Sequence, residues 1–240
     1  MKRILVFQHH PHEHPGTLRD FLAEDGIGWD VVRLDSGEPI PPLAGYDALI
    51  VMGGPQDVWQ EDRYPWLAAE KAAIREAVVL LALPYLGICL GHQLLAAALG
   101  GAVAPMTGHA EIGVREVELL PAGERDPLLG GNGRSLWCLQ WHAAEVTSLP
   151  EGAEALARSP ATKIQAMRYG PRAYGLQFHV EAGESTVRDW AGIPAYKRAL
   201  ERGLGPGELS LFAAEAARRA DAFRQTARRL YDRFKALAGG

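Results

Sequence analysis

Short apolar runs alternate with longer amphipathic stretches along the first half of the chain. Residues 4–7, 29–34, 46–52 and the run that ends at Ile88 are compact and rich in apolar side chains, which is typical of buried strands. Residues 18–26, 66–83 and the Ala- and Leu-rich stretch from 90 to 100 have the apolar spacing of helices. Strands that alternate with helices predict a mostly parallel central sheet with helices on both faces, which is an α/β fold.

The pattern changes in the second half of the chain. Residues 113–119 alternate between apolar and polar side chains, as a half-exposed strand does. Residues 136–142, 163–169 and 173–179 also have the composition of strands, and the intervals between them are short. Because short connections favour antiparallel pairing, we expect a few antiparallel strands at one side of the sheet.

The chain from about residue 185 onward is predicted to be helical. Its apolar residues recur at steps of three and four or sums of these steps, which predicts one long amphipathic helix carrying Leu209, Phe212, Ala216, Phe223, Ala227, Leu230, Phe234 and Leu237. We expect this stripe to cover the sheet rather than to bind a partner protein. Because the sequence has no internal repeat and no linker, we expect a single domain over residues 1–240, with the C-terminal helical segment packed on it.

Composition and charge narrow the possible functions. A net charge of -4 and the lack of a basic cluster argue against nucleic-acid binding. No apolar stretch is long enough to span a bilayer, and the run after Lys2 and Arg3 is too short for a signal peptide. Two cysteines, Cys89 and Cys138, form no disulfide framework and fit a reducing compartment. We therefore expect a cytoplasmic protein that binds neither nucleic acid nor membranes.

The strongest chemical signal is the turn around Cys89. An apolar strand ends at Gly87, and a helical segment begins after Gly91, so the cysteine lies in a Gly-x-Cys-x-Gly turn. This is the sulfur counterpart of the Gly-x-Ser-x-Gly nucleophile elbow, in which the nucleophile lies at the carboxyl edge of a sheet. The N-terminus of the following helix favours negative charge and hence a thiolate. The alternative is a buried structural cysteine between two packing glycines.

A cysteine nucleophile needs a base and a group that orients the base, and His179 with Glu181 could supply both. If the strand continues through them, residues two apart point to the same side of it. His142 is a competing base because it also ends a strand, but it has no carboxylate two residues later. His92 is expected to point away from the sulfur, and Cys138 is expected in the core.

Three motifs occur together in the chain: Gly53-Gly54-Pro55, Gly-Ile-Cys-Leu-Gly-His-Gln at 87–93, and Gln-Phe-His-Val-Glu at 177–181. In this order and at these separations, they resemble the class I (triad) glutamine amidotransferases. The chain looks most similar to the stand-alone branch related to the glutaminase domain of GMP synthase, and the likeness covers its whole length. The resemblance implies a flavodoxin-like architecture, with no metal and no cofactor.

The resemblance also implies roles for particular residues. Cys89 would be the nucleophile, His179 the general base and acid, and Glu181 the carboxylate that orients His179. The backbone N–H groups of Leu90 and of the Gly53-Gly54 turn, most of all Gly54, would form the oxyanion hole. The residues that would hold the amino-acid end of the substrate are Gly53, Gln93, Trp141 and His142.

Two positions depart from the family pattern. Val180 replaces the usual proline between the triad residues, and Ala144 replaces an aspartate that relatives often carry. The second change removes one possible contact to the ammonium group of the substrate.

The function implied is hydrolysis of glutamine to glutamate and ammonia, possibly for a separate synthetase subunit. The chain carries no ATP pyrophosphatase motif. One alternative is a γ-glutamyl peptidase or hydrolase acting on a larger γ-glutamyl small molecule. The other is a non-catalytic regulatory subunit, against which the intact Cys89, His179 and Glu181 argue.

A histidine-rich loop follows the first predicted strand and contains His9, His10, His12 and His14. Alternating histidines can bind zinc or nickel, but the loop holds two prolines and no neighbouring cysteine. Because the loop leaves the carboxyl end of a strand, we expect it to border the active-site cleft rather than to bind a metal.

Overall fold

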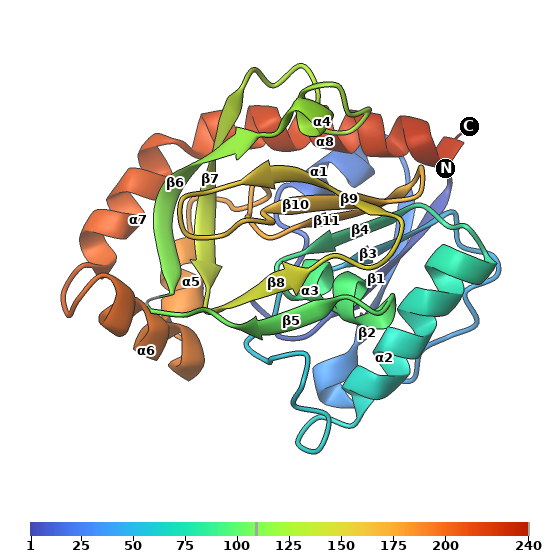
Figure 1. Ribbon diagram of the computed structural model, residues 1–240, viewed down its shortest axis with the longest axis horizontal. Helices are drawn as coiled ribbons and strands as arrows, with labels where there is room; N and C mark the ends of the chain where they lie inside the picture. The colour runs from blue at the N-terminus through green and yellow to red at the C-terminus, as the bar shows by residue number, and fades with distance from the viewer. Residues whose placement is uncertain (109, 240) are drawn as a thin grey trace.

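The computed structural model describes residues 1–108 and 110–239, and its centre is a nine-stranded sheet (Figure 1). The strand order is β2-β1-β3-β4-β11-β10-β9-β6-β7. Five adjacent strands run parallel: β2 (Gly28–Arg33), β1 (Arg3–Gln8), β3 (Ala48–Val51), β4 (Tyr85–Ile88) and β11 (Ala173–Leu176). The predicted α/β fold with a mostly parallel sheet is confirmed.

The remaining four strands of the sheet pair antiparallel, as the short connections predicted. They are β10 (Ala166–Tyr169), β9 (Ala153–Arg158), β6 (Glu111–Leu119) and β7 (Ser135–His142). A separate two-stranded sheet is formed by β5 (Ala102–Pro105) and β8 (Ala144–Ser148). The apolar pattern did not reveal β5, β8 and β9, which are only four, five and six residues long.

Alternate side chains of β1 point into two separate cores, as the pleat of a strand requires. Ile4 and Val6 pack on the face covered by α1 (Leu18–Glu24), while Leu5 and Phe7 pack on the face covered by α2 (Trp66–Arg75) and α3 (Leu90–Ala98). A 3-10 turn (Leu34–Ser36) follows β2, a π-helical turn (Glu76–Leu80) extends α2, and the short α4 (Pro121–Glu124) follows β6. Both faces of the sheet are therefore covered at β1, and functional groups of such a sheet gather at the ends of its strands.

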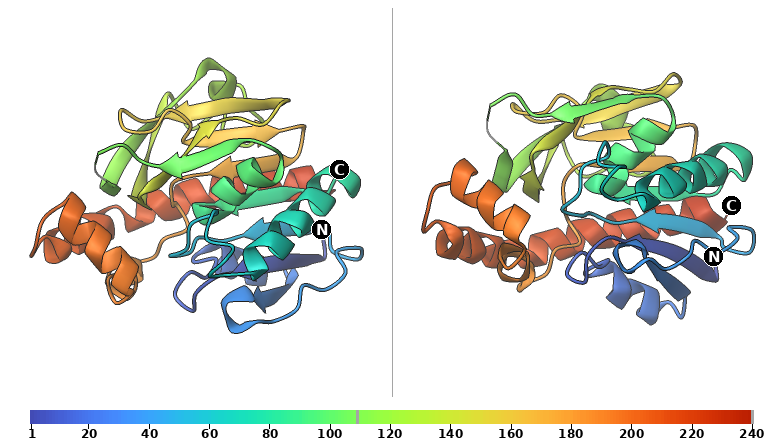
Figure 2. Two further views of the ribbon diagram at one scale, coloured as in Figure 1. Left: turned by 60° about the horizontal axis from the view of Figure 1, so that its bottom comes forward. Right: turned by 90° about the horizontal axis from the view of Figure 1, so that it is seen from below.

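The C-terminal segment contains four helices: α5 (Thr186–Ala191), α6 (Pro194–Gly203), α7 (Leu209–Arg218) and α8 (Ala220–Gly239). The prediction of one long helix over the apolar stripe is wrong, because Arg219 (φ -108°, ψ 3°) interrupts it. In Figure 2 the orange α5–α7 lie together at one end of the molecule, and the red α8 returns along the sheet. None of the described helices is long and apolar enough to cross a membrane.

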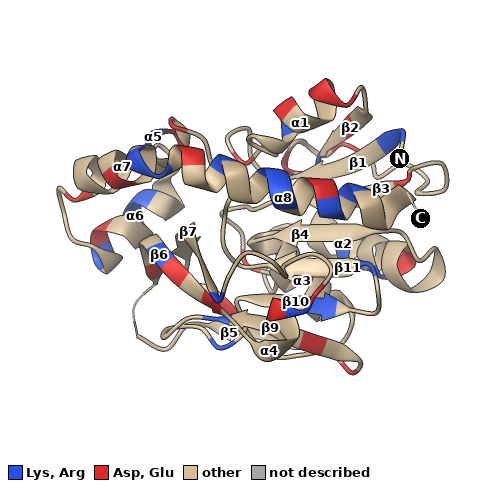
Figure 3. Ribbon diagram, turned by 90° about the horizontal axis from the view of Figure 1, so that it is seen from above, with Lys and Arg blue, Asp and Glu red and all other residues tan. Residues whose placement is uncertain are grey.

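The apolar stripe is divided between two cores, and the change from one core to the other falls within α8, after the break. Phe212, Ala216 and Phe223 pack with Trp141 and Trp190 beneath α5 and α6. The later residues Ala227, Leu230 and Phe234 pack on the same sheet face as β1, as predicted. Acidic and basic residues are mixed along α8 (Figure 3). Its basic residues form ion pairs with α1, among them Arg224 with Asp20 at 2.6 Å and Arg228 with Glu24 at 2.7 Å.

Candidate active site

Cys89 lies at the sharp turn between β4 and α3, with φ 53° and ψ -102°. A positive φ at a non-glycine residue costs of order 1–3 kcal/mol and is found mostly at functional sites. A Cβ atom on Gly87 would overlap the carbonyl oxygen of Gly91, and one on Gly91 would overlap that of Val51. The two glycines therefore allow strand and helix to approach closely enough to form the elbow.

His179 and Glu181 form a buried pair, with 2.6 Å between Nδ1 and Oε1. The reasoning that placed them on a continuing strand is wrong, because β11 ends at Leu176. His179 instead pairs with Leu139 of β7 through two backbone hydrogen bonds of 2.9 Å. The chain bends at Phe178 and Val180 on either side of this bridge, yet the side chains of His179 and Glu181 still meet.

The charge state of His179 is set by its neighbours. Burial lowers its pKa, but the negative charge of Glu181 and hydrogen bonds to Cys89 and Glu181 outweigh burial and raise the pKa well above the ordinary value. The edge of Trp190 contacts the imidazole ring, with 4.6 Å between ring centroids. His179 is therefore held as an imidazolium beside the thiol. In this form it can donate a proton.

Gln177 also contacts the sulfur, although the sequence motifs gave it no role. Its Nε2 donates to Cys89 Sγ at 3.6 Å, and its Oε1 accepts from Gln93 Nε2 at 3.0 Å. Gln93 in turn donates to the backbone carbonyl of Ala144 at 3.1 Å. Gln177 stands two residues before His179 in the Gln-Phe-His-Val-Glu motif, and this position in the motif could have identified it as a site residue.

A cavity of about 170 Å³ opens beside Cys89. Six of the residues predicted to act in the site line this cavity: Gly54, Cys89, Leu90, Gln93, Trp141 and His142. Among the residues that the structure describes, Gly53, His179 and Glu181 are not part of its wall. Helix α6 supplies Tyr196, Ala199 and Arg202, which the sequence pattern did not associate with the site. Helix α6 therefore forms part of the cavity wall as well as covering a core.

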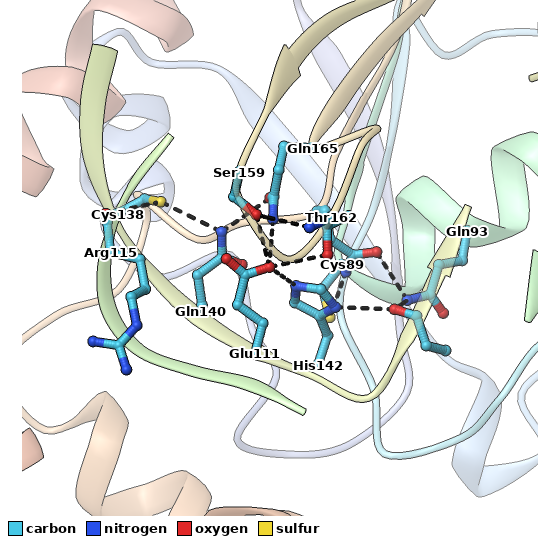
Figure 4. A network of polar contacts seen from close by, with 12 residues as sticks. Cys89, Gln93, Glu111, Arg115, Cys138, Gln140, His142, Ser159, Thr162 and Gln165 are labelled. Carbon is cyan, nitrogen blue, oxygen red and sulfur yellow. Dashed lines mark hydrogen bonds and ion pairs between the residues drawn. The ribbon is translucent and has the colours of Figure 1, made fainter. Parts of the chain in front are cut away.

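His142 has a carboxylate partner, contrary to the argument from sequence. Its Nε2 lies 3.3 Å from Glu111 Oε2, and its Nδ1 lies 2.9 Å from the carbonyl oxygen of Ala144 (Figure 4). Glu111 comes from β6, where it is the register partner of His142 across the antiparallel pair. The expected place for a carboxylate was two residues along the chain, whereas the partner lies on the neighbouring strand.

The Glu111 carboxylate lies at the centre of a polar network. It accepts hydrogen bonds from Ser159 and Thr162 at 3.0 Å and from Gln165 at 2.8 Å. Burial raises its pKa, but hydrogen bonds and the charge of His142 outweigh burial and lower it. His142 Nδ1 is thus held by a backbone carbonyl, and Nε2 lies near Glu111 without a hydrogen bond of normal geometry, so the ring faces these groups as part of the cavity wall.

The histidine-rich loop lies against the Gly53-Gly54 turn. His9 is fully buried, whereas His12 is exposed. The loop thus adjoins the cavity through this turn, but none of its four histidines belongs to the cavity wall. Among the described residues, no group of three or more His, Cys, Asp or Glu side chains could hold a metal ion.

Glu13, from the same loop, is a buried carboxyl group that no sequence motif marked. It is 1% exposed, and burial raises its pKa to about 7, although the charge of His179 and the hydroxyl of Tyr196 partly lower it. A Cβ atom on Gly53 would lie 2.6 Å from Glu13 Oε2 and 3.4 Å from the ring of His179. Glu13 is thus packed between the Gly53-Gly54 turn and the His179–Glu181 pair.

The remaining two candidates lie in the core. His92 is buried against Gly175 of β11, and burial together with the charge of His142 lowers its pKa to about 3. Cys138 is fully buried, and burial raises its pKa well above the ordinary value. Neither group is available to react at neutral pH.

Comparisons with known proteins identify the family of the chain. The family model "Glutamine amidotransferase class-I" matches residues 16–189. The glutamine amidotransferase-like protein YfeJ of Salmonella typhimurium is 35% identical over 75% of each chain. A glutamine-hydrolyzing GMP synthase subunit from Archaeoglobus fulgidus is 31% identical over 84% of this chain and 98% of its own. The crystal structure of a glutamine amidotransferase from Thermotoga maritima superposes with a TM-score of 0.86 at 31% identity, covering 97% of each chain.

Proposed function

The chain belongs to the class I glutamine amidotransferase family, and from this premise we propose that it hydrolyses the side-chain amide of glutamine through a thioester on Cys89. The observation that carries the proposal is the environment of the thiol. Cys89 lines the cavity and accepts a hydrogen bond from Gln177, and it is one of the neighbours that raise the pKa of His179, which is paired with Glu181.

The first half-reaction forms the thioester. The Cys89 thiolate attacks the amide carbon, and the carbonyl oxygen becomes an oxyanion near the backbone N–H groups of Gly54 and Leu90. Donors placed where charge develops typically contribute about 3 kcal/mol each. His179 then gives its proton to the leaving nitrogen, the C–N bond breaks, and ammonia departs. The thioester and a neutral His179 remain.

The second half-reaction releases glutamate. His179 takes a proton from a water molecule, which attacks the thioester carbon and forms a second oxyanion in the same hole. The C–S bond then breaks, the thiolate re-forms, and His179 is again an imidazolium. Glu181 keeps the ring oriented and stabilises its charge in both steps. The proposed chemistry needs no metal and no cofactor.

We propose that Gly53, Gln93, Trp141 and His142 hold the amino-acid end of the substrate. Three of these residues line the cavity, and Gly53 precedes Gly54 in its wall. The hydrogen bonds from Gln93 to Ala144 and Gln177 fix its amide group before substrate arrives. A fixed amide loses little conformational entropy on binding.

The A. fulgidus relative is named as one subunit of a glutamine-hydrolyzing GMP synthase. We propose that ammonia from this chain is likewise consumed by a separate synthetase subunit. We further propose that residues 1–240 act as one domain, because α6 lines the same cavity as the elbow at Cys89.

A second candidate substrate is a larger γ-glutamyl compound. A further cavity of about 120 Å³ lies beside the first and shares Ala143 and Arg202 with it. The exposed guanidinium of Arg202 could bind a carboxylate on the leaving group of a γ-glutamyl peptide. In this case an amine, rather than ammonia, would take the proton from His179.

The deciding experiment measures glutamate release by the purified protein from glutamine and from γ-glutamyl dipeptides. We expect turnover of at least one of them, lost in Cys89→Ala and kept in the matched control Cys138→Ala. Turnover of dipeptides alone, reduced by Arg202→Gln, would select the second candidate. If neither substrate is hydrolysed and iodoacetamide does not label Cys89, the proposal is wrong and a non-catalytic regulatory role is the better interpretation.

A further inference from the structure

His9 contacts the backbone of the Gly53-Gly54 turn. It directly follows β1, and its side chain is fully buried. Its Nδ1 lies 2.8 Å from the carbonyl oxygen of Gly53. A carbonyl oxygen can only accept a hydrogen bond, so Nδ1 must carry the proton.

The other nitrogen of His9 faces a second buried group. Its Nε2 lies 2.8 Å from Glu70 Oε1 on α2, and both side chains are fully buried. The imidazole also stacks on Trp66, one turn earlier on α2, with 5.4 Å between ring centroids and 12° between the planes. Both nitrogens and one face of the ring are therefore held, so the ring has a single orientation.

The ionisation of this pair strengthens the contact to Gly53. Burial lowers the pKa of His9, but the charge of Glu70 and the hydrogen bonds to Glu70 and Gly53 outweigh burial and raise the pKa above its ordinary value. A charged donor makes a stronger hydrogen bond to a carbonyl than a neutral one. A bound carbonyl also polarises its own peptide group, which improves the N–H as a donor.

The geometry of the peptide bond links this contact to the orientation of the Gly54 N–H at the cavity. The peptide between Gly53 and Gly54 is planar and trans, so its C=O and N–H point in opposite directions. Holding the Gly53 oxygen toward His9 therefore turns the Gly54 N–H away from His9. Gly54 lines the cavity beside Cys89, whereas His9 does not.

The Gly53–Gly54 peptide lies between two glycines, so its orientation depends on contacts such as the hydrogen bond from His9. Glycine adopts many backbone conformations, so this peptide could rotate and present its carbonyl oxygen to the cavity instead. Larger residues could not restrain it, because a Cβ on Gly54 would lie 2.8 Å from the Cβ of His9 and 2.9 Å from a methyl group of Leu90. The restraint must come from outside the turn.

We propose that His9 and Glu70 are positioning residues that hold the Gly53 carbonyl, so that the Gly54 N–H is presented to the oxygen on which negative charge develops. This inference rests on the proposed function, in which Gly54 contributes to the oxyanion hole. It also explains why a buried ion pair is retained where well-packed apolar residues would serve stability equally well.

The test replaces the pair with apolar residues in His9→Phe/Glu70→Leu. Phenylalanine can still stack on Trp66, and removing both partners leaves no unpaired buried charge. We expect a folded protein with a similar melting temperature, a kcat about 100-fold lower and a KM changed by less than about threefold. His9→Phe alone is the weaker design, because it leaves Glu70 without its partner.

Two further variants separate positioning from packing. In His9→Asn/Glu70→Leu, the amide nitrogen takes the place of Nδ1 and can still donate to Gly53, and no buried charge is left unpaired, so we expect at least about a tenth of the wild-type kcat. His12→Phe is the matched control, because His12 is an exposed histidine of the same loop, and we expect wild-type kinetics. A folded His9→Phe/Glu70→Leu variant with wild-type kcat, or with its loss confined to KM, would overturn the inference.

A crystal structure of His9→Phe/Glu70→Leu tests, without reference to turnover, whether His9 fixes the orientation of the Gly53–Gly54 peptide. We expect the Gly53–Gly54 peptide to be rotated or to occupy two orientations, and an unchanged single orientation would contradict the positioning role. If the wild-type protein hydrolyses no γ-glutamyl amide, the proposed function fails, while this structure still decides whether the pair holds the peptide.

Discussion

Replacing Glu13 with glutamine should change the pH dependence of stability in a defined way. The carboxyl group is 1% exposed and packs against Gly53, with His179, Glu181, His9 and Tyr196 as its titratable neighbours. Burial disfavours the charged form, which raises its pKa from 4.5 to about 7 in the folded protein.

The direction in which stability changes with pH follows from proton binding. Between pH 4.5 and about 7, the folded state keeps the Glu13 proton, whereas the unfolded state loses it. The folded state therefore binds more protons, and the wild-type protein loses stability as the pH rises through this interval. At about 1.36 kcal/mol per pH unit, the loss amounts to about 3 kcal/mol by about pH 8. A glutamine side chain does not titrate, so Glu13→Gln escapes this loss.

The measurement is urea unfolding of both proteins at several pH values from about 4.5 to about 8. We expect the variant to gain about 3 kcal/mol relative to wild type between the lowest and highest pH, or roughly 1 M in urea midpoint. Glu151→Gln removes an exposed carboxylate and controls for the general loss of one negative charge. A stability difference that stays constant with pH, or that moves against the variant as pH rises, would refute the reasoning.

Three further predictions concern the thiols, the triad and the C-terminal helices. Limited iodoacetamide treatment followed by mass spectrometry should label Cys89, which lines the cavity, before the fully buried Cys138; preferential labelling of Cys138 would contradict this. His179→Ala should abolish glutamate release, whereas Glu181→Gln should leave a measurable remnant, because the base survives in a less well oriented form. Adding Glu181→Gln to His179→Ala should then cost little more, and a large extra loss would argue against a shared role. Truncation after Pro206 removes α7 and α8 and exposes two apolar cores, so loss of cooperative melting is expected; a soluble, active truncate would show that these helices are dispensable.

Features that depend on neighbours along the chain were predictable from sequence. The alternation of apolar runs and helical spacing led to the α/β fold, and three ordered motifs led to the family, and both are confirmed. The turn at Cys89 was identified because its two glycines and its cysteine lie close together in the chain, from Gly87 to Gly91. The triad roles of His179 and Glu181 stay a prediction, although the structure places the two side chains in contact.

Features that depend on contacts between distant segments required the tertiary structure. Glu70 lies 61 residues from His9, and Glu111 meets His142 only because β6 pairs with β7. The burial of Glu13 depends on the Gly53-Gly54 turn and on α6, neither of which adjoins it in sequence. Apolar periodicity also failed to reveal the break at Arg219, because the stripe keeps its spacing across the break, with Phe212 of α7 and Phe223 of α8 in the same core. Local patterns determine which side chains point to one face of an element, but sheet topology determines which elements meet and therefore which buried charges find partners.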